Sequence, residues 1–375
     1  MTPQELNRYS RHFLLPEIGR DGQEKLKKSA VFVVGAGGLG SPLLLYLAAA
    51  GVGRIGIIDF DPVDESNLQR QVLYVTKDIG FLKVEKAREK LIALNPYIQV
   101  EIFADRLNAK NAVSLFEKYD VIADGTDNFS TRYLTNDAGF FAKKPVVSAS
   151  VLGFEGQLGV FNYFGGACYR CLYPEPPPMG TMPSCAEGGV LGVLPGIMGT
   201  LQCLEVIKVI LGLGDVMSNR LLHFDALAGS FQSLETVRDQ DCSLCGNKPT
   251  IVRLSEDSAF CTTMKKGESE MILQMECVEL QRKINEGEDF QLLDVREDFE
   301  RDICQIENSV HIPLKEVVDR YQELSDKKQI VVYCKMGGRS QKACEVLAAK
   351  GYNVANLKGG IIGWIDNVDP SMEKY

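Results

Sequence analysis

One segment near the amino end constrains the fold of this chain more than any other feature. Residues 30–34 (AVFVV) contain no polar side chain, which is typical of a parallel strand that is covered on both faces. Four glycines lie within the next six residues, and Ser41-Pro42 then opens an apolar helical pattern that runs to residue 50. A strand, a glycine turn and a helix in this order predict the first unit of a doubly wound α/β sheet.

The same alternation of strands and helices continues along the first two thirds of the chain. Glycine and aromatic residues alternate over 153–163, which indicates an antiparallel extension of the sheet. We therefore expect a Rossmann-like, mainly parallel sheet. The further expected strands are 55–58, 100–104, 121–123 and 146–148, and the further expected helices are 83–94 and 201–211.

A polar stretch over residues 249–274 separates a second, smaller α/β pattern from the first. We therefore expect a domain at 1–248, a linker at 249–274 and a second domain at 275–375. In the second domain the predicted helices are 278–284, 314–324 and 340–347, and the predicted strands are 291–293, 330–333 and 354–357.

Composition excludes several classes of protein. The chain has 375 residues and a formal net charge of −9, which argues against nucleic acid or an anionic membrane as a partner. Glycine and proline interrupt the long uncharged stretches at 29–53 and 188–204, and no signal peptide opens the chain. We expect a soluble protein of a reducing compartment, the cytoplasm, whose eleven cysteines include ligands and nucleophiles rather than disulfides.

The glycine turn itself matches a nucleotide-binding motif. Residues 35–40 (GAGGLG) fit G-x-G-x-x-G, in which backbone N–H groups and a helix N-terminus receive phosphate. Asp59 follows about 20 residues later, where an acidic residue can hold ribose hydroxyls. The motif does not separate NAD from ATP, and a purely structural glycine turn is the alternative.

Polar residues gather where the next predicted strands end, which is the edge at which open α/β sheets bind ligands. Adenylyl transfer needs cations and often an Asp-bound Mg²⁺, whereas hydride transfer needs little positive charge near the phosphates. Arg70, Lys83 and a carboxylate such as Asp127 meet that need, although each of them alone could be a solvated loop residue. The full cluster is Asp61, Ser66, Asn67, Leu68, Gln69, Arg70, Gln71, Lys83, Asp127 and Asn128.

Two C-x-x-C pairs, Cys168/Cys171 and Cys242/Cys245, indicate a metal site. Four thiolates suit a tetrahedral structural Zn²⁺ without an open position for catalysis. The long gap between the pairs weakens the motif taken alone. A redox C-x-x-C is the alternative, but neither pair opens a helix after a thioredoxin-like strand.

Together these motifs resemble the MoeB/ThiF family, bacterial relatives of ubiquitin-activating enzymes, over residues 4–248. The resemblance rests on RYSR at 8–11, GAGGLG, DFD at 59–61, SNLQRQ at 66–71, Asp127-Asn128 and the paired C-x-x-C. It implies an enzyme that adenylates the C-terminal Gly-Gly carboxylate of a small ubiquitin-like sulfur carrier with Mg·ATP. It also implies a homodimer in which Arg11 reaches the neighbour's phosphates. The residues that it implies at ATP or Mg²⁺ are Gly38, Asp59, Ser66 to Arg70, Lys83, Asp127 and Asn128.

Cys185 lies in a predicted loop and has two interpretations. A free cysteine is most often a small buried hydrophobic residue, as we expect for Cys203. The family resemblance instead implies that Cys185 is a mobile thiol near the acyl-adenylate, where it attacks the acyl group or, later, the carrier's acyl disulfide.

A third cysteine site follows the predicted strand 330–333. Cys334 precedes a predicted helix, and backbone N–H groups, Lys335 and Arg339 can stabilise a thiolate or persulfide there. The spacing to Arg339 is one residue short of a tyrosine-phosphatase loop. The wider pattern resembles a rhodanese over about 275–372, through LDVRE at 293–297, His311-Ile312-Pro313, this loop, Gly359-Gly360 and Gly363-Trp364. The resemblance implies a persulfide on Cys334, and an inactive rhodanese scaffold is the alternative.

The two halves together suggest one reaction sequence, in which a carrier is adenylated and then receives sulfur from Cys334 to form a thiocarboxylate. A persulfide donor such as a cysteine desulfurase would load Cys334. Fused chains of this kind resemble adenylyltransferase/sulfurtransferases of molybdopterin, thiamin, cysteine or tRNA-thiolation pathways. An activator of a protein modifier that works through a Cys185 thioester and an NAD-dependent oxidoreductase remain alternatives.

Overall fold

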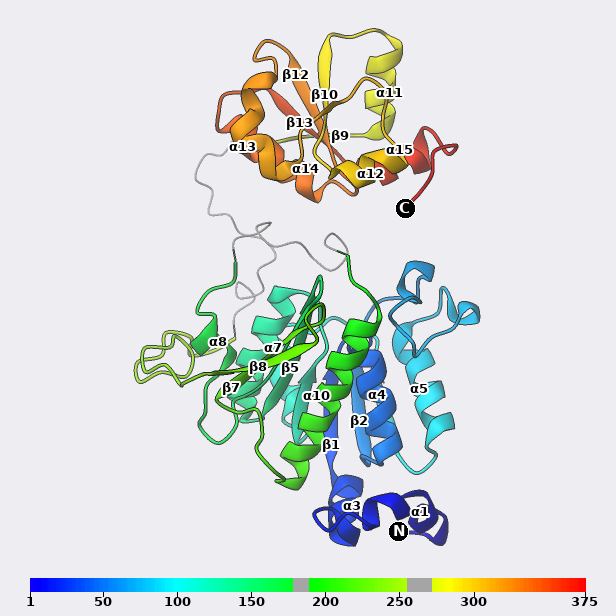
Figure 1. The fold of residues 1–375 in the computed structure, drawn as a ribbon, viewed down its shortest axis with the longest axis vertical. Helices are drawn as coiled ribbons and strands as arrows, with labels where there is room; N and C mark the ends of the chain where they lie inside the picture. The colour runs from blue at the N-terminus through cyan, green and yellow to red at the C-terminus, as the bar shows by residue number, and fades with distance from the viewer. Residues whose placement is uncertain (178–188, 255–271) are drawn as a thin grey trace. The chain divides into compact units, whose positions relative to one another are not determined.

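The computed structural model describes residues 1–177, 189–254 and 272–375, which form two compact units (Figure 1). The first unit contains the described residues up to 254. The second contains residues 272–375.

An eight-stranded sheet with the order β3-β2-β1-β4-β5-β6-β7-β8 forms the centre of the first unit. The first five strands are parallel, and β6, β7 and β8 extend the sheet in antiparallel fashion. The prediction of a Rossmann-like, mainly parallel sheet is therefore confirmed. The strands are β1 (Ala30–Val34), β2 (Arg54–Ile58), β3 (Gln99–Phe103), β4 (Val121–Asp124), β5 (Val146–Leu152), β6 (Glu155–Phe161), β7 (Arg220–Asp225) and β8 (Ser230–Glu235).

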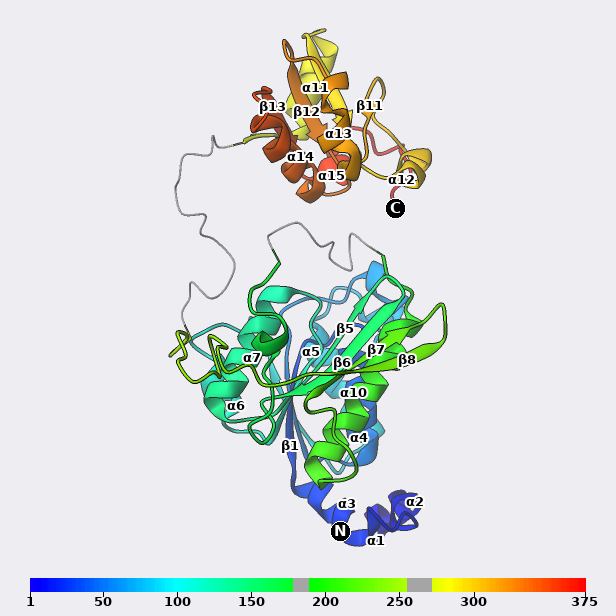
Figure 2. The same ribbon diagram turned by 60° about the vertical axis from the view of Figure 1, so that its left-hand side comes forward.

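Helices cover both faces of this sheet (Figure 2). Successive strand residues point to opposite sides, so apolar strands such as β1 present an apolar surface on each face. Val31 and Val33 of β1 pack into the core beneath α4, α5 and α10, whereas Phe32 packs against α6 and α7. The helices and turns are α1 (Pro3–Arg8), α2 (Ser10–Phe13), α3 (Gly19–Lys28), α4 (Gly40–Ala50), η1 (Glu65–Asn67), η2 (Thr76–Asp78), α5 (Lys83–Leu94), α6 (Ala112–Phe116), α7 (Phe129–Ala142), α8 (Tyr169–Leu172) and α10 (Val193–Leu211).

Helix α10 begins at Val193, eight residues before the predicted start. The prediction was wrong because it treated Pro195 as a break, whereas proline is tolerated in the first turn of a helix. Of the described residues, α10 is the one helix that is long and apolar enough to cross a membrane. Half of that apolar stretch is buried, and the helix packs on α4, β5 and β6, so it is a core helix of this unit.

The second unit is a five-stranded, all-parallel sheet with the order β11-β10-β12-β13-β9 and helices around it. The predicted helix at 314–324 is wrong, since three short turns stand there. Only Val317 and Leu324 of that segment are buried, which leaves little packing to hold a continuous helix. The elements are β9 (Leu273–Met275), α11 (Cys277–Asn285), β10 (Phe290–Asp294), α12 (Asp298–Ile303), β11 (Val310–His311), η4 (Leu314–Glu316), α13 (Val317–Arg320), η5 (Tyr321–Glu323), β12 (Gln329–Tyr333), α14 (Gly338–Ala348), β13 (Val354–Leu357) and α15 (Gly360–Asn367).

Candidate active sites and metal centre

A cavity of about 610 Å³ lies at the carboxyl end of the parallel strands of the first unit. Four of its lining segments follow neighbouring strands: 35–39 after β1, 59–61 after β2, 105–108 after β3 and 125–128 after β4. Open α/β sheets bind ligands at this edge. The cavity is therefore the first candidate active site.

The glycine loop turns from β1 into α4 along one wall of the cavity. Gly35 has a φ of +90°, and a Cβ on Gly40 would lie 2.1 Å from the carbonyl oxygen of Gly35. A Cβ on Gly37 would instead meet only the side-chain nitrogen of Gln71, at 3.8 Å. Gly35 and Gly40 thus allow the turn, while Gly37 leaves the backbone open toward the cavity, as a phosphate site at a helix N-terminus requires.

Asp59 and Lys83 meet next to this loop. The carboxylate of Asp59 accepts hydrogen bonds from the backbone N–H groups of Ala36 (2.8 Å) and Asp61 (2.9 Å). Burial raises the pKa of Asp59 above its ordinary value, although Lys83 and these two N–H groups act in the opposite direction. The ammonium of Lys83, whose side chain is buried, lies 3.1 Å from the Asp61 carboxylate. The loop, the acidic residues and a cation are therefore fixed together.

The segment that carries Asp127 is held from beneath by a buried carboxylate. Asp124 is fully buried and accepts hydrogen bonds from the backbone N–H and the hydroxyl of Thr126, at 3.1 and 2.6 Å. Arg132 lies 3.4 Å from Asp124 and donates to the carbonyl oxygen of Thr126. Asn128 caps helix α7 with its side chain. Asp127 itself is exposed and lines the cavity, free of these structural roles.

Most of the predicted nucleotide-site residues line this one cavity, and the others lie outside it. Residues 66–69 do not line it: they form or follow η1, whose first turn is capped by Asp64 through the Ser66 N–H (2.9 Å). Arg11 is exposed on α2, which packs against α3 just before β1 begins, at the opposite edge of the sheet. The predicted residues that line the cavity are Gly38, Asp59, Asp61, Arg70, Gln71, Lys83, Asp127 and Asn128.

Sequence reasoning missed a further part of the lining. Asp105, Arg106, Leu107 and Asn108 face the same cavity, and the Arg106 guanidinium lies 3.7 Å from the centre of the Phe60 ring. The signal was present, because these residues follow β3 as the recognised residues follow β1, β2 and β4.

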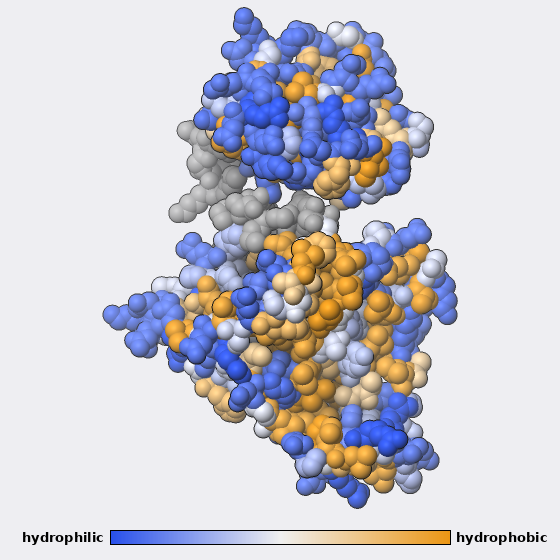
Figure 3. Space-filling model, in the orientation of Figure 1, coloured by the Kyte–Doolittle hydropathy of each residue, from blue (hydrophilic) through white to orange (hydrophobic). Residues whose placement is uncertain are grey.

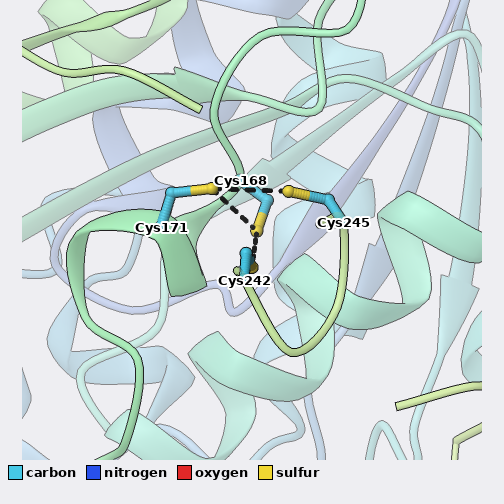
Figure 4. A group of neighbouring side chains, drawn as sticks. All are labelled: Cys168, Cys171, Cys242 and Cys245. Atoms are coloured by element: carbon cyan, nitrogen blue, oxygen red, sulfur yellow. Dashed lines mark hydrogen bonds between the residues drawn. The ribbon is translucent and has the colours of Figure 1, made fainter. Parts of the chain in front are cut away.

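The four cysteines of the two C-x-x-C pairs meet at one point (Figure 4). Their sulfur atoms all lie within 4.8 Å of one another, and three of the four residues are buried. Neighbouring sulfurs are 3.7 Å apart for Cys168 and Cys171, 3.6 Å for Cys168 and Cys242, and 3.4 Å for Cys171 and Cys245. A Zn–S bond of about 2.3 Å in a tetrahedron requires sulfur separations of about 3.8 Å. The cluster therefore fits a four-sulfur zinc site, and its separations are too long for disulfides.

A buried ion pair fastens one side of this cluster to helix α7. Arg170, between Cys168 and Cys171, makes a bidentate contact with Asp137, with Nε–Oδ1 at 2.9 Å and Nη2–Oδ2 at 2.8 Å. The two side chains are only 7% and 1% exposed. Although burial acts against it, the contact with Asp137 raises the pKa of Arg170 above its ordinary value. Each of these two buried charges needs the other as its partner. No sequence motif predicted this ion pair.

The second candidate active site is the loop from Cys334 to Arg339, which follows β12 and ends in the first turn of α14. Sγ of Cys334 accepts a hydrogen bond from the N–H of Gly337 (3.1 Å) and one from the hydroxyl of Ser340 (3.4 Å). The positive end of the α14 dipole faces the same sulfur. The arrangement is suited to a sulfur anion, as the sequence predicted.

Arg339, at the end of this loop, is held by Glu300 of α12. Its Nη2 lies 2.7 Å from Oε1 of Glu300, and both residues are largely buried. Burial raises the pKa of Glu300, but the hydrogen bonds from Arg339 and from the Glu297 N–H outweigh it, so the net pKa is below the ordinary value. Glu300 is therefore ionised at neutral pH and keeps Arg339 in place.

Two further cysteines carried a prediction from the sequence, Cys203 and Cys185. Cys203 is 2% exposed within α10, which confirms the prediction that it packs in the core. Cys185 lies outside the described residues.

Comparisons with known proteins agree with these two units. The profile of the ThiF family matches residues 9–244, and that of the rhodanese-like domain matches residues 277–367. The chain belongs to the ThiF family. It is 42% identical to the adenylyltransferase and sulfurtransferase MOCS3 of Sus scrofa, over all of this chain and 89% of that protein. It is 43% identical to the probable adenylyltransferase/sulfurtransferase MoeZ of Mycobacterium tuberculosis, over all of this chain and 96% of that protein. The predicted enzyme classes, adenylyltransferase and sulfurtransferase, are thereby confirmed for this ThiF-family chain.

Solved structures add a likeness to the first unit. The crystal structure of E. coli MccB with ATP has a TM-score of 0.57 and 25% identity to this chain, covering 64% of this chain and 75% of MccB. The family implies the use of ATP, and the cysteine cluster suggests zinc.

Proposed function

We propose that this ThiF-family chain adenylates the C-terminal Gly-Gly carboxylate of a ubiquitin-like sulfur carrier and converts it to a thiocarboxylate with sulfur from Cys334. The observation that carries the proposal is the presence, on one chain, of a glycine-loop cavity with three cations and of a cysteine at a helix N-terminus. The three cations are Arg70, Lys83 and Arg106. The MOCS3 and MoeZ relatives carry both enzyme classes in their names.

In the first step, a carboxylate oxygen of the carrier attacks the α-phosphorus of ATP, and pyrophosphate leaves. Negative charge grows on the phosphate oxygens in this step, and fixed cations lower its cost. Arg70 and Lys83 supply this charge, the glycine loop receives the phosphates and Asp59 holds the ribose. Asp127, exposed at the cavity, would hold Mg²⁺, which would neutralise charge on the phosphates.

In the second step, the terminal sulfur of a Cys334 persulfide attacks the acyl carbon, and AMP leaves. The carrier is then joined to Cys334 through an acyl disulfide. A thiol, from Cys185 or an external reductant, attacks the Cys334 sulfur and releases the thiocarboxylate, leaving a disulfide that a further thiol reduces. A cysteine desulfurase is the class of enzyme that reloads Cys334 with a persulfide.

The same proposal includes a structural zinc in each chain and, separately, a homodimer. Cys168, Cys171, Cys242 and Cys245 hold the zinc as a structural ion without an open position. Arg11 does not reach the cavity of its own chain, so it contributes to the cavity of a second copy. Figure 3 supports self-association, because hydrophobic surface gathers over α10 and α4 of the first unit, where Tyr46, Val193 and Leu204 are exposed.

The test combines ATP–pyrophosphate exchange with mass spectrometry of the carrier. With a Gly-Gly-ended carrier from the same cell we expect exchange in the wild-type chain and about a 100-fold loss in Asp127→Ala. Cys334→Ala should keep exchange but yield no thiocarboxylate, while Cys304→Ser, which changes another cysteine of the same unit, should keep both. Absence of exchange with every such carrier would refute the proposal. A carrier that stays thioester-linked to Cys185 without a sulfur donor would favour a protein-modifier activator instead.

A further inference from the structure

Several charged side chains near the Cys334 loop contact one aromatic residue, Tyr375. Tyr375 accepts a hydrogen bond from Nη1 of Arg296 (2.8 Å) and donates one to Oε1 of Glu300 (3.1 Å). Burial raises the pKa of Tyr375 above its ordinary value, so its hydroxyl stays protonated and able to donate. The ring lies 4.6 Å from the ammonium of Lys335.

Two of these three contacts lead to residues of the Cys334 loop. Glu300 is the partner of Arg339, the last residue of the loop. Lys335 directly follows Cys334 and is the loop residue whose ammonium meets the Tyr375 ring. A cation over an aromatic ring is attracted electrostatically to its face.

The other side of the Tyr375 hydroxyl is anchored in the domain core. Arg296 is fully buried and makes a bidentate contact with the equally buried Asp294, at 2.9 and 2.6 Å. Its guanidinium also donates to the carbonyl oxygens of Glu300 (3.1 Å) and Cys304 (2.8 Å). The Tyr375 hydroxyl is therefore hydrogen-bonded to a buried, fully paired guanidinium, and this bond restricts the movement of the Tyr375 ring.

We propose that Tyr375 is a positioning residue of the Cys334 site, whose ring orients Lys335 and whose hydroxyl orients Glu300 and thereby Arg339. The inference rests on the proposed sulfurtransferase function, and it concerns how anionic sulfur donors are attracted. Without the ring the ammonium of Lys335, the residue that follows Cys334 in the sequence, loses its contact and becomes mobile. We expect an anionic reagent then to reach Cys334 less readily. A neutral reagent is affected much less, because it gains nothing from the cation.

The first experiment does not require sulfur transfer. The full-length chain is alkylated with iodoacetate, which is anionic, or iodoacetamide, which is neutral, and the rate at Cys334 is followed by peptide mass spectrometry. We expect Tyr375→Leu to lower the iodoacetate-to-iodoacetamide rate ratio about fivefold, or about 1 kcal/mol. Tyr375→Phe keeps the ring and should lower it less than twofold. Tyr352→Phe, which removes a hydroxyl bonded to the Tyr321 carbonyl (3.2 Å) elsewhere in the unit, should leave the ratio unchanged.

A double variant separates positioning from a general loss of structure. Lys335→Ala should lower the ratio by itself. Adding Tyr375→Leu should then lower it less than twofold further, because the ring has no cation left to orient and only the hydroxyl contact with Glu300 remains to be lost. Additive losses would overturn the inference, as would an unchanged ratio in Tyr375→Leu. A fall in both alkylation rates would do the same, since it would indicate a general change around the loop.

A second experiment connects the inference to the proposed activity. With thiosulfate as donor and cyanide as acceptor, Tyr375→Leu should raise the KM for thiosulfate about fivefold, with kcat changed less. An unchanged KM would overturn the inference. If the wild-type chain transfers no sulfur while the alkylation ratios behave as expected, the proposed function fails and the positioning role of Tyr375 stands.

Discussion

The buried ion pair between Arg170 and Asp137 allows a prediction whose size follows from the structure. In Arg170→Met the apolar part of the side chain is retained, but the Asp137 carboxylate, 1% exposed, loses its cation. Removing one partner of a buried pair costs about 3–5 kcal/mol, because the remaining charge stays buried without compensation. Domains are stable by only about 5–15 kcal/mol, so we expect a severely weakened first unit.

Urea unfolding measures this loss with an internal control. Far-UV circular dichroism follows the whole chain, and fluorescence of Trp364, the single tryptophan, follows the second unit alone. We expect the transition of the first unit to move down by about 1–1.7 M urea, for a slope of about 3 kcal/mol/M. The Trp364 transition should not move. Bound zinc should also fall, since Arg170 stands between two of the cysteine ligands.

A double variant tests the reasoning itself. Arg170→Met with Asp137→Leu removes both charges, so it should be more stable than Arg170→Met alone. If Arg170→Met lowered the free energy of unfolding by less than about 1 kcal/mol, the argument would be refuted. A double variant no more stable than that single variant would refute it too.

Three further predictions follow from other parts of the structure. Gly40→Ala should lower the melting temperature of the first unit sharply, since its Cβ would lie 2.1 Å from the carbonyl oxygen of Gly35. Acid should lower the stability of the second unit, because the pKa of Glu300 is lower in the folded chain than its ordinary value of 4.5. The stabilisation from ionised Glu300 is complete above pH 4.5 and is lost as the pH falls through the pKa of the folded state. Thermal melts followed by Trp364 fluorescence between pH 3 and 6 measure this loss. Cys242→Ser should reduce zinc bound per chain in a metal assay, because three sulfurs leave the tetrahedron incomplete.

Matched variants control each of these measurements. Gly196→Ala, whose Cβ would have no atom within 4 Å, should keep the melting temperature that Gly40→Ala loses. In Glu300→Gln the melting temperature of the second unit should fall less between pH 6 and pH 3 than in the wild type. An equal fall would contradict the conclusion that Glu300 causes it. Cys304→Ser should keep its zinc, and equal zinc in Cys242→Ser would argue against the cluster.

Local patterns were sufficient for the parallel core of both units. The all-apolar strand 30–34 and the strand 354–357 have the predicted bounds. Because the carboxyl ends of parallel strands share one edge, the order of strands and loops was also enough to expect a single cavity there. The same reasoning could not predict η1, because Asp64 draws the Ser66 backbone into a local turn away from that cavity.

Periodicity and spacing describe neighbours along the chain, so the sequence alone determined most of the central strands, the glycine turn, the cysteine pairs and the Cys334 loop. The tertiary structure decided which distant residues meet. Sulfurs 74 positions apart approach to 3.6 Å, and Tyr375 reaches Glu300 across 75 positions. Such contacts depend on strand order and on which side chains can be buried together, because a buried charge such as Asp137 is stable only where the fold brings it a partner.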